Sequence, residues 1–344
     1  MSALFDLASA GLRRLDAETA HHLAIRALKL GLAPGAPSDD PILATTVAGL
    51  ALPNPVGLGA GFDKSAEAIP ALLRAGFGFV ECGTVTPRPQ AGNPRPRLFR
   101  LGEDRAVINR MGFNNDGLEA FAARLARRPA GGVVGANLGA NKDSEDRIAD
   151  YVAGLGRLDG LADYFTVNIS SPNTPGLRAL QGREALDELL GRLAEARRGP
   201  APVFLKIAPD LEPGEIAMIV EACVAHRLDG MIVSNTTLDR PASLRSAHAG
   251  EAGGLSGAPL RDKALAALRT AHEAAAGRLV LIGVGGIATG ADAYARIRAG
   301  ASAVQLYSAL IFDGPGLVGR IKRDLAARLR ADGFASVAEA VGRA

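Results

Sequence analysis

The part of this chain best suited to chemistry is the ten-residue run at 168–177, which reads NISSPNTPGL. It holds two amide side chains, three hydroxyls and two prolines, and it carries no charge. Because proline fixes φ and removes a backbone donor, this composition predicts a stiff loop that keeps its amides and hydroxyls in place. Such a loop suits a planar polar ligand, and it places a serine where a reaction could need a base.

A regular alternation of apolar runs and helical patterns, from about residue 40 onward, must position this loop. We expect strands at 55–58, 78–81, 133–137, 164–168, 203–207, 230–234, 279–283 and 303–306. Helical patterns lie between most of these runs, for example at 184–197, 215–225 and 263–275. Eight strands that mostly alternate with helices predict an α/β fold, a (β/α)8 TIM barrel, with a doubly wound sheet as the alternative on pattern alone.

Polar residues follow nearly every predicted strand, and in a barrel the carboxyl ends of the strands carry the active site. In chain order these ends hold Ala60, Gly61, Phe62, Asp63 and Lys64, then Thr84, Asn137, Asn168, Lys206, Ser234 to Thr237, Gly283 to Gly286, and Tyr307 with Ser308. A single asparagine after a strand is commonly a turn residue, and Lys64 alone is as readily a surface lysine. Lys206 lies inside the apolar run 203–207, where an unpaired lysine is costly, so its position favours a functional role.

Two glycine-rich segments, 254–257 and 283–290, indicate a phosphate site. The second nearly matches a dinucleotide fingerprint, but no leading βαβ unit is evident around it, so that signal is weak. Glycines after the last strands of a barrel more often cradle a phosphate with backbone N–H groups. A phosphate cradle, a buried lysine and many amides indicate a phosphorylated planar cofactor. FMN fits, because a cation such as Lys206 can stabilise the reduced anionic ring.

The composition of the 344 residues excludes several other classes of protein. The net charge is only +3 and no basic stripe alternates with aromatic residues, so nucleic acid is not an expected partner. Cys82 and Cys223 are the two cysteines, which fits a reducing compartment. The five histidines are scattered and no metal-ligand spacing occurs, so no metal site is expected. No run approaches the ~20 apolar residues of a membrane span, and the start of the chain lacks a signal-peptide pattern.

The first 32 residues differ from the rest, because their apolar positions predict two short amphipathic helices, the second beginning after a capping Asp16. A linker at 34–38 follows, so we expect an N-terminal helical extension at 1–38 and a barrel domain at 39–344. The densest basic run, Arg95, Arg97, Arg100 and Arg105, lies among prolines, and a solvated loop is as good an interpretation as a functional one.

Six motifs together resemble one family, the dihydroorotate dehydrogenases, and within it class 2, the quinone-linked type. They are GAGFDK at 59–64, NRMGFNN at 109–115, the run 168–177, SNTT at 234–237, GGLSG at 253–257 and GVGGI at 283–287. The resemblance covers essentially the whole chain. It implies oxidation of (S)-dihydroorotate to orotate in de novo pyrimidine (UMP) biosynthesis. FMN takes the hydride from C6 while a base removes the C5 proton.

The resemblance also assigns roles within the run 168–177. The base of class 2 members is a serine, and Ser171 occupies the matching position. Class 1 members use a cysteine on another loop, and neither Cys82 nor Cys223 lies in a comparable loop. Because the pKa of a free serine is far above 7, the proton needs a relay, which we expect Thr174 to supply while Phe113 shields the site.

The remaining site residues are also carried over from the family pattern. The expected FMN-binding residues are Ala60, Gly61, Phe62, Asp63, Lys64, Thr84, Asn137, Asn168, Lys206, Ser234, Gly257, Gly286, Tyr307 and Ser308. The expected substrate-binding residues are Lys64, Asn109, Arg110, Met111, Gly112, Phe113, Asn168, Asn173, Asn235 and Thr236. Amides suit this task because a pyrimidine edge offers alternating donors and acceptors. Ser234 departs from a family position that is often threonine, but it keeps the hydroxyl.

In class 2 members the extension resembles a two-helix cap that docks on the membrane and admits ubiquinone or menaquinone to the flavin. His21 and Arg100 match polar residues at the mouth of that tunnel, although the extension could instead only cover the barrel. The family implies a monomer, peripheral on the cytoplasmic face of a cell membrane that the composition indicates is bacterial.

Three other functions remain open at this point. A soluble class 1 enzyme would use fumarate or NAD, and an assay of acceptors separates it from class 2. An aldolase or isomerase barrel would use Lys206 as a Schiff-base nucleophile and would be colourless when purified. A catalytically inactive binding barrel would be unaffected by Ser171→Ala.

Overall fold

Eight parallel strands close into a barrel in the computed structural model, which describes residues 10–33, 35–36 and 38–343. They are β3 (Val56–Leu58), β4 (Phe79–Val85), β7 (Val133–Leu138), β8 (Tyr164–Asn168), β9 (Val203–Ile207), β10 (Gly230–Val233), β12 (Val280–Val284) and β13 (Ala303–Leu306). The order around the barrel is β10-β12-β13-β3-β4-β7-β8-β9. All eight predicted strands are confirmed, and the barrel excludes the doubly wound alternative.

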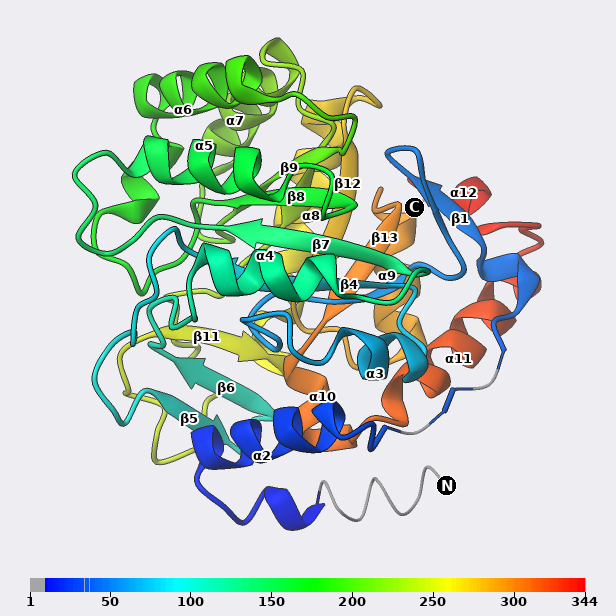
Figure 1. Ribbon diagram of the computed structural model, residues 1–344. Helices are drawn as coiled ribbons and strands as arrows, with labels where there is room; N and C mark the ends of the chain where they lie inside the picture. The colour runs from blue at the N-terminus through cyan, green and yellow to red at the C-terminus, as the bar shows by residue number, and fades with distance from the viewer. Residues whose placement is uncertain (1–9, 34, 37, 344) are drawn as a thin grey trace.

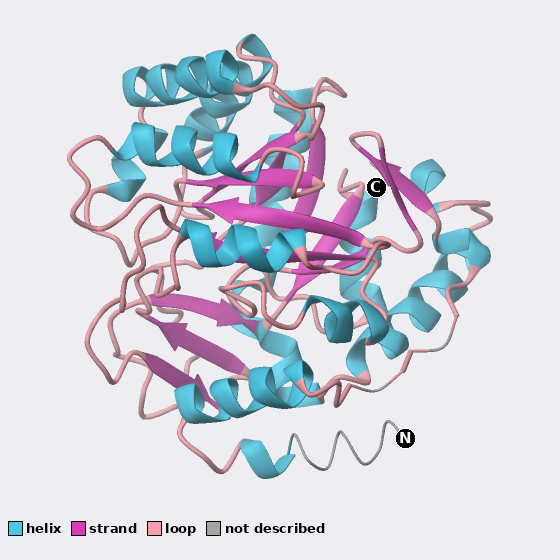
Figure 2. Ribbon diagram, in the orientation of Figure 1, coloured by secondary structure: helices cyan, strands magenta, loops and turns pink. Residues whose placement is uncertain are grey.

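Helices surround the strands, as Figure 2 shows in cyan around magenta. In chain order they are α3 (Ile69–Arg74), α4 (Leu118–Ala126), α5 (Arg147–Leu158), α6 (Arg183–Ala196), α7 (Pro213–Ala225), α8 (Arg261–Ala275), α9 (Gly290–Arg298), α10 (Ser308–Asp313), α11 (Leu317–Ala331) and α12 (Val337–Ala340). Short 3-10 helices lie at Pro41–Leu43, Leu177–Gln181 and Ala258–Leu260. The three helices expected from the sequence are α6, α7 and α8, each beginning one or two residues earlier than predicted.

Two small antiparallel sheets were not predicted from the sequence. The hairpin β1 (Thr45–Val47) and β2 (Leu50–Leu52) packs Val47 and Leu52 against Phe79, Tyr164 and Phe204 near the beginnings of barrel strands. The second sheet has the order β11-β6-β5 and consists of β5 (Leu98–Leu101), β6 (Ala106–Asn109) and β11 (Gly254–Gly257). Figure 1 places it below the barrel in that view, where it joins the loops after β4 and β10.

The second predicted N-terminal helix is confirmed as α2 (Ala17–Lys29), and its cap Asp16 accepts a hydrogen bond from the Thr19 amide at 2.9 Å. The first predicted helix lies largely outside the described residues. Helix α2 lies beside β5 (Figure 1). Among the described residues, no helix is both long enough and apolar enough to cross a membrane.

The basic run at 95–105 is not a solvated loop, because its arginines bind other segments. Arg97 is buried and pairs with Glu18 of α2 at 2.6 Å, and Arg95 reaches the same carboxylate at 3.0 Å. Arg100 donates to the Arg13 carbonyl at 2.6 Å, and Arg105 pairs with Asp313. The two contacts to Glu18 fasten α2 to the chain at 95–97. The predicted domain boundary at 38–39 stays a prediction.

Candidate active site

One cavity opens at the carboxyl ends of the barrel strands, and most of the predicted site residues line it. They are His21, Ala60, Gly61, Lys64, Thr84, Asn109, Met111, Gly112, Phe113, Asn168, Ser171, Asn173, Lys206, Ser234, Asn235, Thr236, Gly257, Gly286, Tyr307 and Ser308. Strand ends, the run 168–177 and the added sheet therefore meet at one mouth, as the barrel prediction requires.

The charge of the cavity is one-sided. Lys64, Lys206 and Arg105 line it, and among the described lining residues there is no carboxylate. Burial, together with the charge of Arg97, lowers the pKa of Lys64 to about 8, although Glu18 opposes the shift. Burial likewise lowers the pKa of Lys206. A cavity with these cations suits anions such as a phosphate and a carboxylate.

Lys206 forms no hydrogen bond or ion pair in the described part of the chain, and it is 5 % exposed. The buried Glu81 attracts its charge from a longer distance and opposes the lowering of its pKa. Because a buried ammonium is costly without a partner, its place on the cavity wall indicates a ligand that supplies the acceptor.

A chain of amides fixes the polar wall. The Asn168 amide nitrogen donates to Thr84 Oγ1 at 3.0 Å and to Asn137 Oδ1 at 3.2 Å, while its oxygen accepts from Asn235 at 3.3 Å. Asn173 donates to Asn109 Oδ1 at 3.1 Å. These hydrogen bonds fix which way each side-chain amide is turned. The amide atoms that they leave unused face the cavity.

A buried carboxylate lies beneath this wall and was missed by sequence reasoning. Glu81 is fully buried and accepts from Asn137 at 2.7 Å, from Gln305 at 2.7 Å and from Tyr164 at 3.0 Å. A carboxylate only accepts hydrogen bonds, so Asn137 must turn its NH2 group toward Glu81. The Asn137 side-chain oxygen then faces Thr84 and Asn168. The sequence signal that could have found Glu81 is an acidic residue in the otherwise apolar predicted strand at 78–81.

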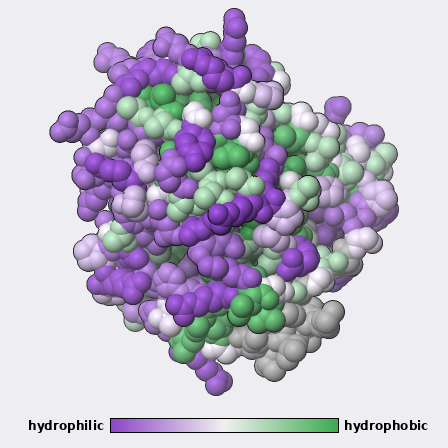
Figure 3. Space-filling model, viewed as in Figure 1, coloured by the Kyte–Doolittle hydropathy of each residue, from purple (hydrophilic) through white to green (hydrophobic). Residues whose placement is uncertain are grey.

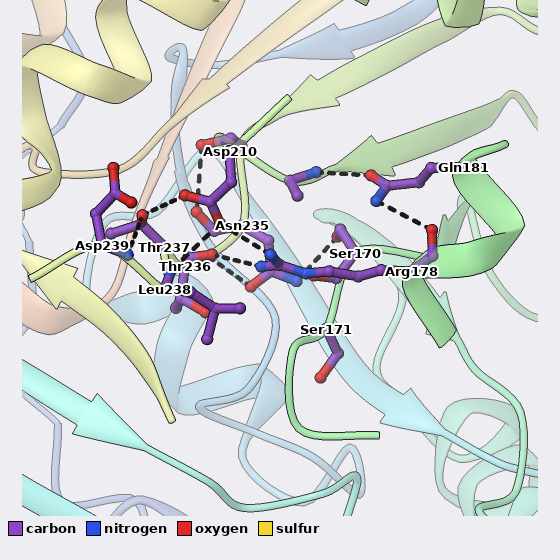
Figure 4. Close-up of polar contacts among 12 residues, drawn as sticks. Ser170, Ser171, Arg178, Gln181, Asp210, Asn235, Thr236, Thr237, Leu238 and Asp239 are labelled. Atoms are coloured by element: carbon purple, nitrogen blue, oxygen red, sulfur yellow. Dashed lines mark hydrogen bonds and ion pairs between the residues drawn. The ribbon is translucent and has the colours of Figure 1, made fainter. Parts of the chain in front are cut away.

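The run at 168–177 holds Ser171 at the cavity wall, 6 % exposed, with its hydroxyl accepting from the Asn173 backbone N–H at 3.3 Å. Figure 4 shows how the guanidinium of Arg178 secures the loop, with Ser171 pointing away from it. Arg178 donates to the Ser170 carbonyl at 3.0 Å, to the Thr236 carbonyl at 3.1 Å and to Asp210 at 2.8 Å. The serine loop, residues 168–177, and the loop after β10 are therefore fixed relative to each other.

Two of the glycines predicted to cradle a phosphate, Gly257 and Gly286, lie in left-handed backbone that other segments approach closely. Gly257 has φ +94°, and a Cβ there would lie 2.4 Å from the Arg105 carbonyl oxygen. Gly286 has φ +69°, and a Cβ there would lie 2.4 Å from Arg261 Cα. Behind them, the buried Arg296 donates to the carbonyls of Arg261 at 2.7 Å and Gly285 at 2.6 Å. The backbone can therefore approach a ligand closely at this end.

Three predicted site residues lie behind the cavity lining. Asn137 belongs to the amide chain described above. Asp63 accepts from the backbone amides of Glu67 at 2.8 Å and Ala68 at 2.7 Å, and burial raises its pKa. Phe62 packs edge-on against both His21 and Tyr307. They support the lining rather than form it.

The other three are Arg110, Thr174 and Arg100. Arg110 pairs with Glu251 at 2.8 Å, and Thr174 is buried with its hydroxyl unpartnered in the described part of the protein. Arg100 is absent from the described lining, since it binds the backbone of 13–15 instead. His21 does line the cavity, and burial lowers its pKa to about 4, so it is neutral at pH 7.

Neither cysteine is placed to act as a base. Cys82 and Cys223 are both buried, burial raises the pKa of each thiol, and neither belongs to the described lining. The residue available in the serine loop is Ser171.

Comparison with known proteins identifies the family of this fold. The family model for dihydroorotate dehydrogenase matches residues 42–329. The chain belongs to the dihydroorotate dehydrogenase family. A protein of Rhodospirillum rubrum named dihydroorotate dehydrogenase (quinone) is 62% identical over 334 residues, which cover 95% of this chain and 91% of that protein. A protein of the same name from Xanthobacter autotrophicus is 59% identical, with 96% of each chain covered.

Solved structures agree. The dihydroorotate dehydrogenase of Eimeria tenella in complex with ferulenol superimposes with a TM-score of 0.92 at 41% identity, covering 95% of both chains. The ligand-free form from the same organism gives 0.91. The resemblance to class 2, the quinone-dependent dihydroorotate dehydrogenases, is confirmed, and this class excludes the aldolase and class 1 alternatives.

Proposed function

We propose that this chain oxidises dihydroorotate to orotate with FMN and a membrane quinone, and that Ser171 is the base. The activity is that of its quinone-dependent family. The observation that carries the finer assignment is the placement of the Ser171 hydroxyl on a wall of amides, in a cavity whose described lining has cations but no carboxylate. An uncharged loop beside cations suits an anionic pyrimidine and favours loss of a proton from it.

The residues present fit FMN. Gly257 and Gly286 leave room for a phosphate among backbone N–H groups, and the hydroxyls of Ser256 and Ser308 lie 2.8 Å apart beside them. At the barrel centre, the unpartnered Lys206 and the Thr84–Asn137–Asn168 group would hold the isoalloxazine ring. Bound FMN would supply the hydride acceptor for the reaction.

The chain's own residues do the remaining work. Lys64 would bind the substrate carboxylate, with Asn109, Asn173 and Asn235 as partners for the pyrimidine edge. The amide network holds these groups before the substrate arrives, so little reorganisation is needed on binding. Ser171 Oγ would take the C5 proton. Thr174, whose hydroxyl has no partner in the described structure, is available to pass it on.

The extension is proposed as the quinone route and the membrane-docking element. His21, Ile311 and Phe312 bring neutral and apolar groups to the cavity on the side of α2. Large exposed hydrophobic residues lie in α2 and at both of its ends, namely Leu15, Leu23, Leu30 and Leu32. Figure 3 shows hydrophobic residues at the lower edge of the molecule, in the region of α2. An apolar face beside a cation, here Arg26, is typical of helices at a membrane surface.

An anaerobic absorbance experiment tests this function. Dihydroorotate should bleach a flavin band and quinone should restore it; a spectrum that stays oxidised contradicts the proposal. Ser171→Ala should retain the flavin and bleach about 10²- to 10⁴-fold more slowly, the range that general bases contribute. Equal rates in wild type and Ser171→Ala would assign the base elsewhere.

A further inference from the structure

Helix α2 carries a buried carboxylate. Glu18 is 5 % exposed and accepts from Arg97 Nη2 at 2.6 Å, with Arg97 Nε at 3.2 and 3.1 Å from its two oxygens. Arg95 adds a contact at 3.0 Å. A carboxylate and a guanidinium buried together are stable only as a pair, because either one alone is costly away from water. The extension is thus locked to the chain at 95–97.

The same guanidinium also holds a loop of the barrel domain. Arg97 Nη1 donates to the Ala91 carbonyl at 2.6 Å and to the Asn93 carbonyl at 2.9 Å. Arginine can do this because its planar fork presents donors in several directions. Glu18 therefore fixes the guanidinium that in turn fixes the loop at 91–97.

The loop at 91–97 touches the proposed substrate site directly. The Asn93 amide donates to the Asn173 carbonyl in the serine loop at 3.0 Å and to the Arg110 carbonyl at 3.0 Å. The Asn93 backbone amide donates to the Met111 carbonyl at 3.0 Å. Met111 and Asn173 line the cavity. A continuous set of hydrogen bonds thus joins α2 to the serine loop.

We infer that the Glu18–Arg97 ion pair makes the N-terminal extension part of the dihydroorotate site. Glu18 and Arg97 are positioning residues: the helix proposed to admit the electron acceptor also holds the loop that orients the substrate. This inference rests on the proposed function, which assigns the cavity at Asn173 and Met111 to dihydroorotate. Because coupling is reciprocal, substrate binding should also tighten the attachment of α2.

Glu18→Gln tests the coupling, since it keeps the size of the side chain and removes the anion. Arg97 would then be buried without a counter-ion, and leaving that place would release the Ala91 and Asn93 carbonyls. With a water-soluble redox dye as acceptor, we expect the KM for dihydroorotate to rise about tenfold, within the usual range of coupling between sites. We expect kcat to change less than KM, and Glu18→Asp to recover part of the loss.

Lys29→Gln is the matched control. Lys29 also ties α2 to the barrel domain, through Glu67 at 2.5 Å, but it does not contact the loop at 91–97. The KM should stay near the wild-type value in this variant. An unchanged KM in Glu18→Gln, or an equal rise in Lys29→Gln, overturns the inference.

Hydrogen exchange separates this inference from the proposed function. In ligand-free protein, Glu18→Gln should speed amide exchange at 91–97 and 171–176, and Lys29→Gln should not. Unchanged exchange in Glu18→Gln overturns the inference. If wild-type flavin is not bleached by dihydroorotate, the proposed function fails, and the exchange result alone decides whether α2 is coupled to the serine loop.

Discussion

At the scale of single residues, the site depends on two lysines whose charge is costly to bury. Lys206 forms no hydrogen bond or ion pair among the described residues, and burial lowers its pKa. Lys64 is close to losing its proton at neutral pH, because burial lowers its pKa to about 8. Glu18 alone among the nearby charges opposes that shift in Lys64. A bound anion stabilises the protonated form of these lysines, so ligand binding and lysine protonation must be linked.

That linkage gives a pH dependence with a defined sign. Lys64 is protonated below about pH 8 and neutral above it, and only the protonated form attracts a carboxylate. Affinity for orotate should therefore be constant below pH 7 and fall by up to about tenfold per unit above pH 8. Titration of the flavin absorbance with orotate measures it. Lys64→Met should bind weakly with a flat profile, and a flat wild-type profile between pH 7 and 9.5 would contradict the assignment.

At the scale of elements, the sequence pattern predicted the barrel strands and missed the short strands of the two added sheets. Parallel strands buried on both faces are continuous apolar runs, so β8, β9 and β13 matched their predicted bounds. The hairpin β1–β2 and the sheet β5–β6–β11 have strands of three or four residues, too short for a clear period.

The sequence pattern also could not predict ion pairs between side chains that are far apart along the chain. Glu18 and Arg97 are 79 positions apart, and nothing in either local pattern links them. Most of the predicted site residues line the cavity, because their motifs follow strand ends. Arg100 lies outside the described lining because it binds the backbone at 13–15, and Thr174 lies outside it with its hydroxyl buried and unpartnered among the described residues.

The glycine cradle makes a prediction at this scale. Gly286→Ala places a methyl group 2.4 Å from Arg261 Cα at φ +69°, so the loop after β12 must move away from the proposed phosphate position. We expect flavin affinity to fall at least about tenfold, measured as flavin absorbance per protein after gel filtration. Gly277→Ala is the control, with φ +78° but no heavy atom within 4 Å. It should cost about 1 kcal/mol of stability and leave flavin content unchanged; equal flavin loss in both variants would rule out a specific cradle.

At the scale of the whole molecule, the two half-reactions are proposed to meet at α2. Its buried side carries Glu18, which binds Arg97 and through it the loop at 91–97. Its other side carries the exposed Leu23, and Leu30 and Leu32 follow directly at the end of the helix. One helix would thus face both the membrane and the active site. A change on its outer face should then affect quinone delivery without affecting the substrate, while a change at Glu18 should do the reverse.

The outer face can be tested by itself. Leu30 and Leu32 are 79% and 57% exposed, so replacing both with glutamine should not disturb the core. Burial of a leucine at a membrane is worth about 1.5–3 kcal/mol, so the double variant should bind vesicles of anionic phospholipid at least about tenfold more weakly in cosedimentation. Its rate with vesicle-borne quinone should fall, and its rate with a soluble dye should not. Leu238→Gln, 51% exposed on the loop after β10, is the control, and equal vesicle binding by both variants would contradict docking through the end of α2 and the residues that follow it.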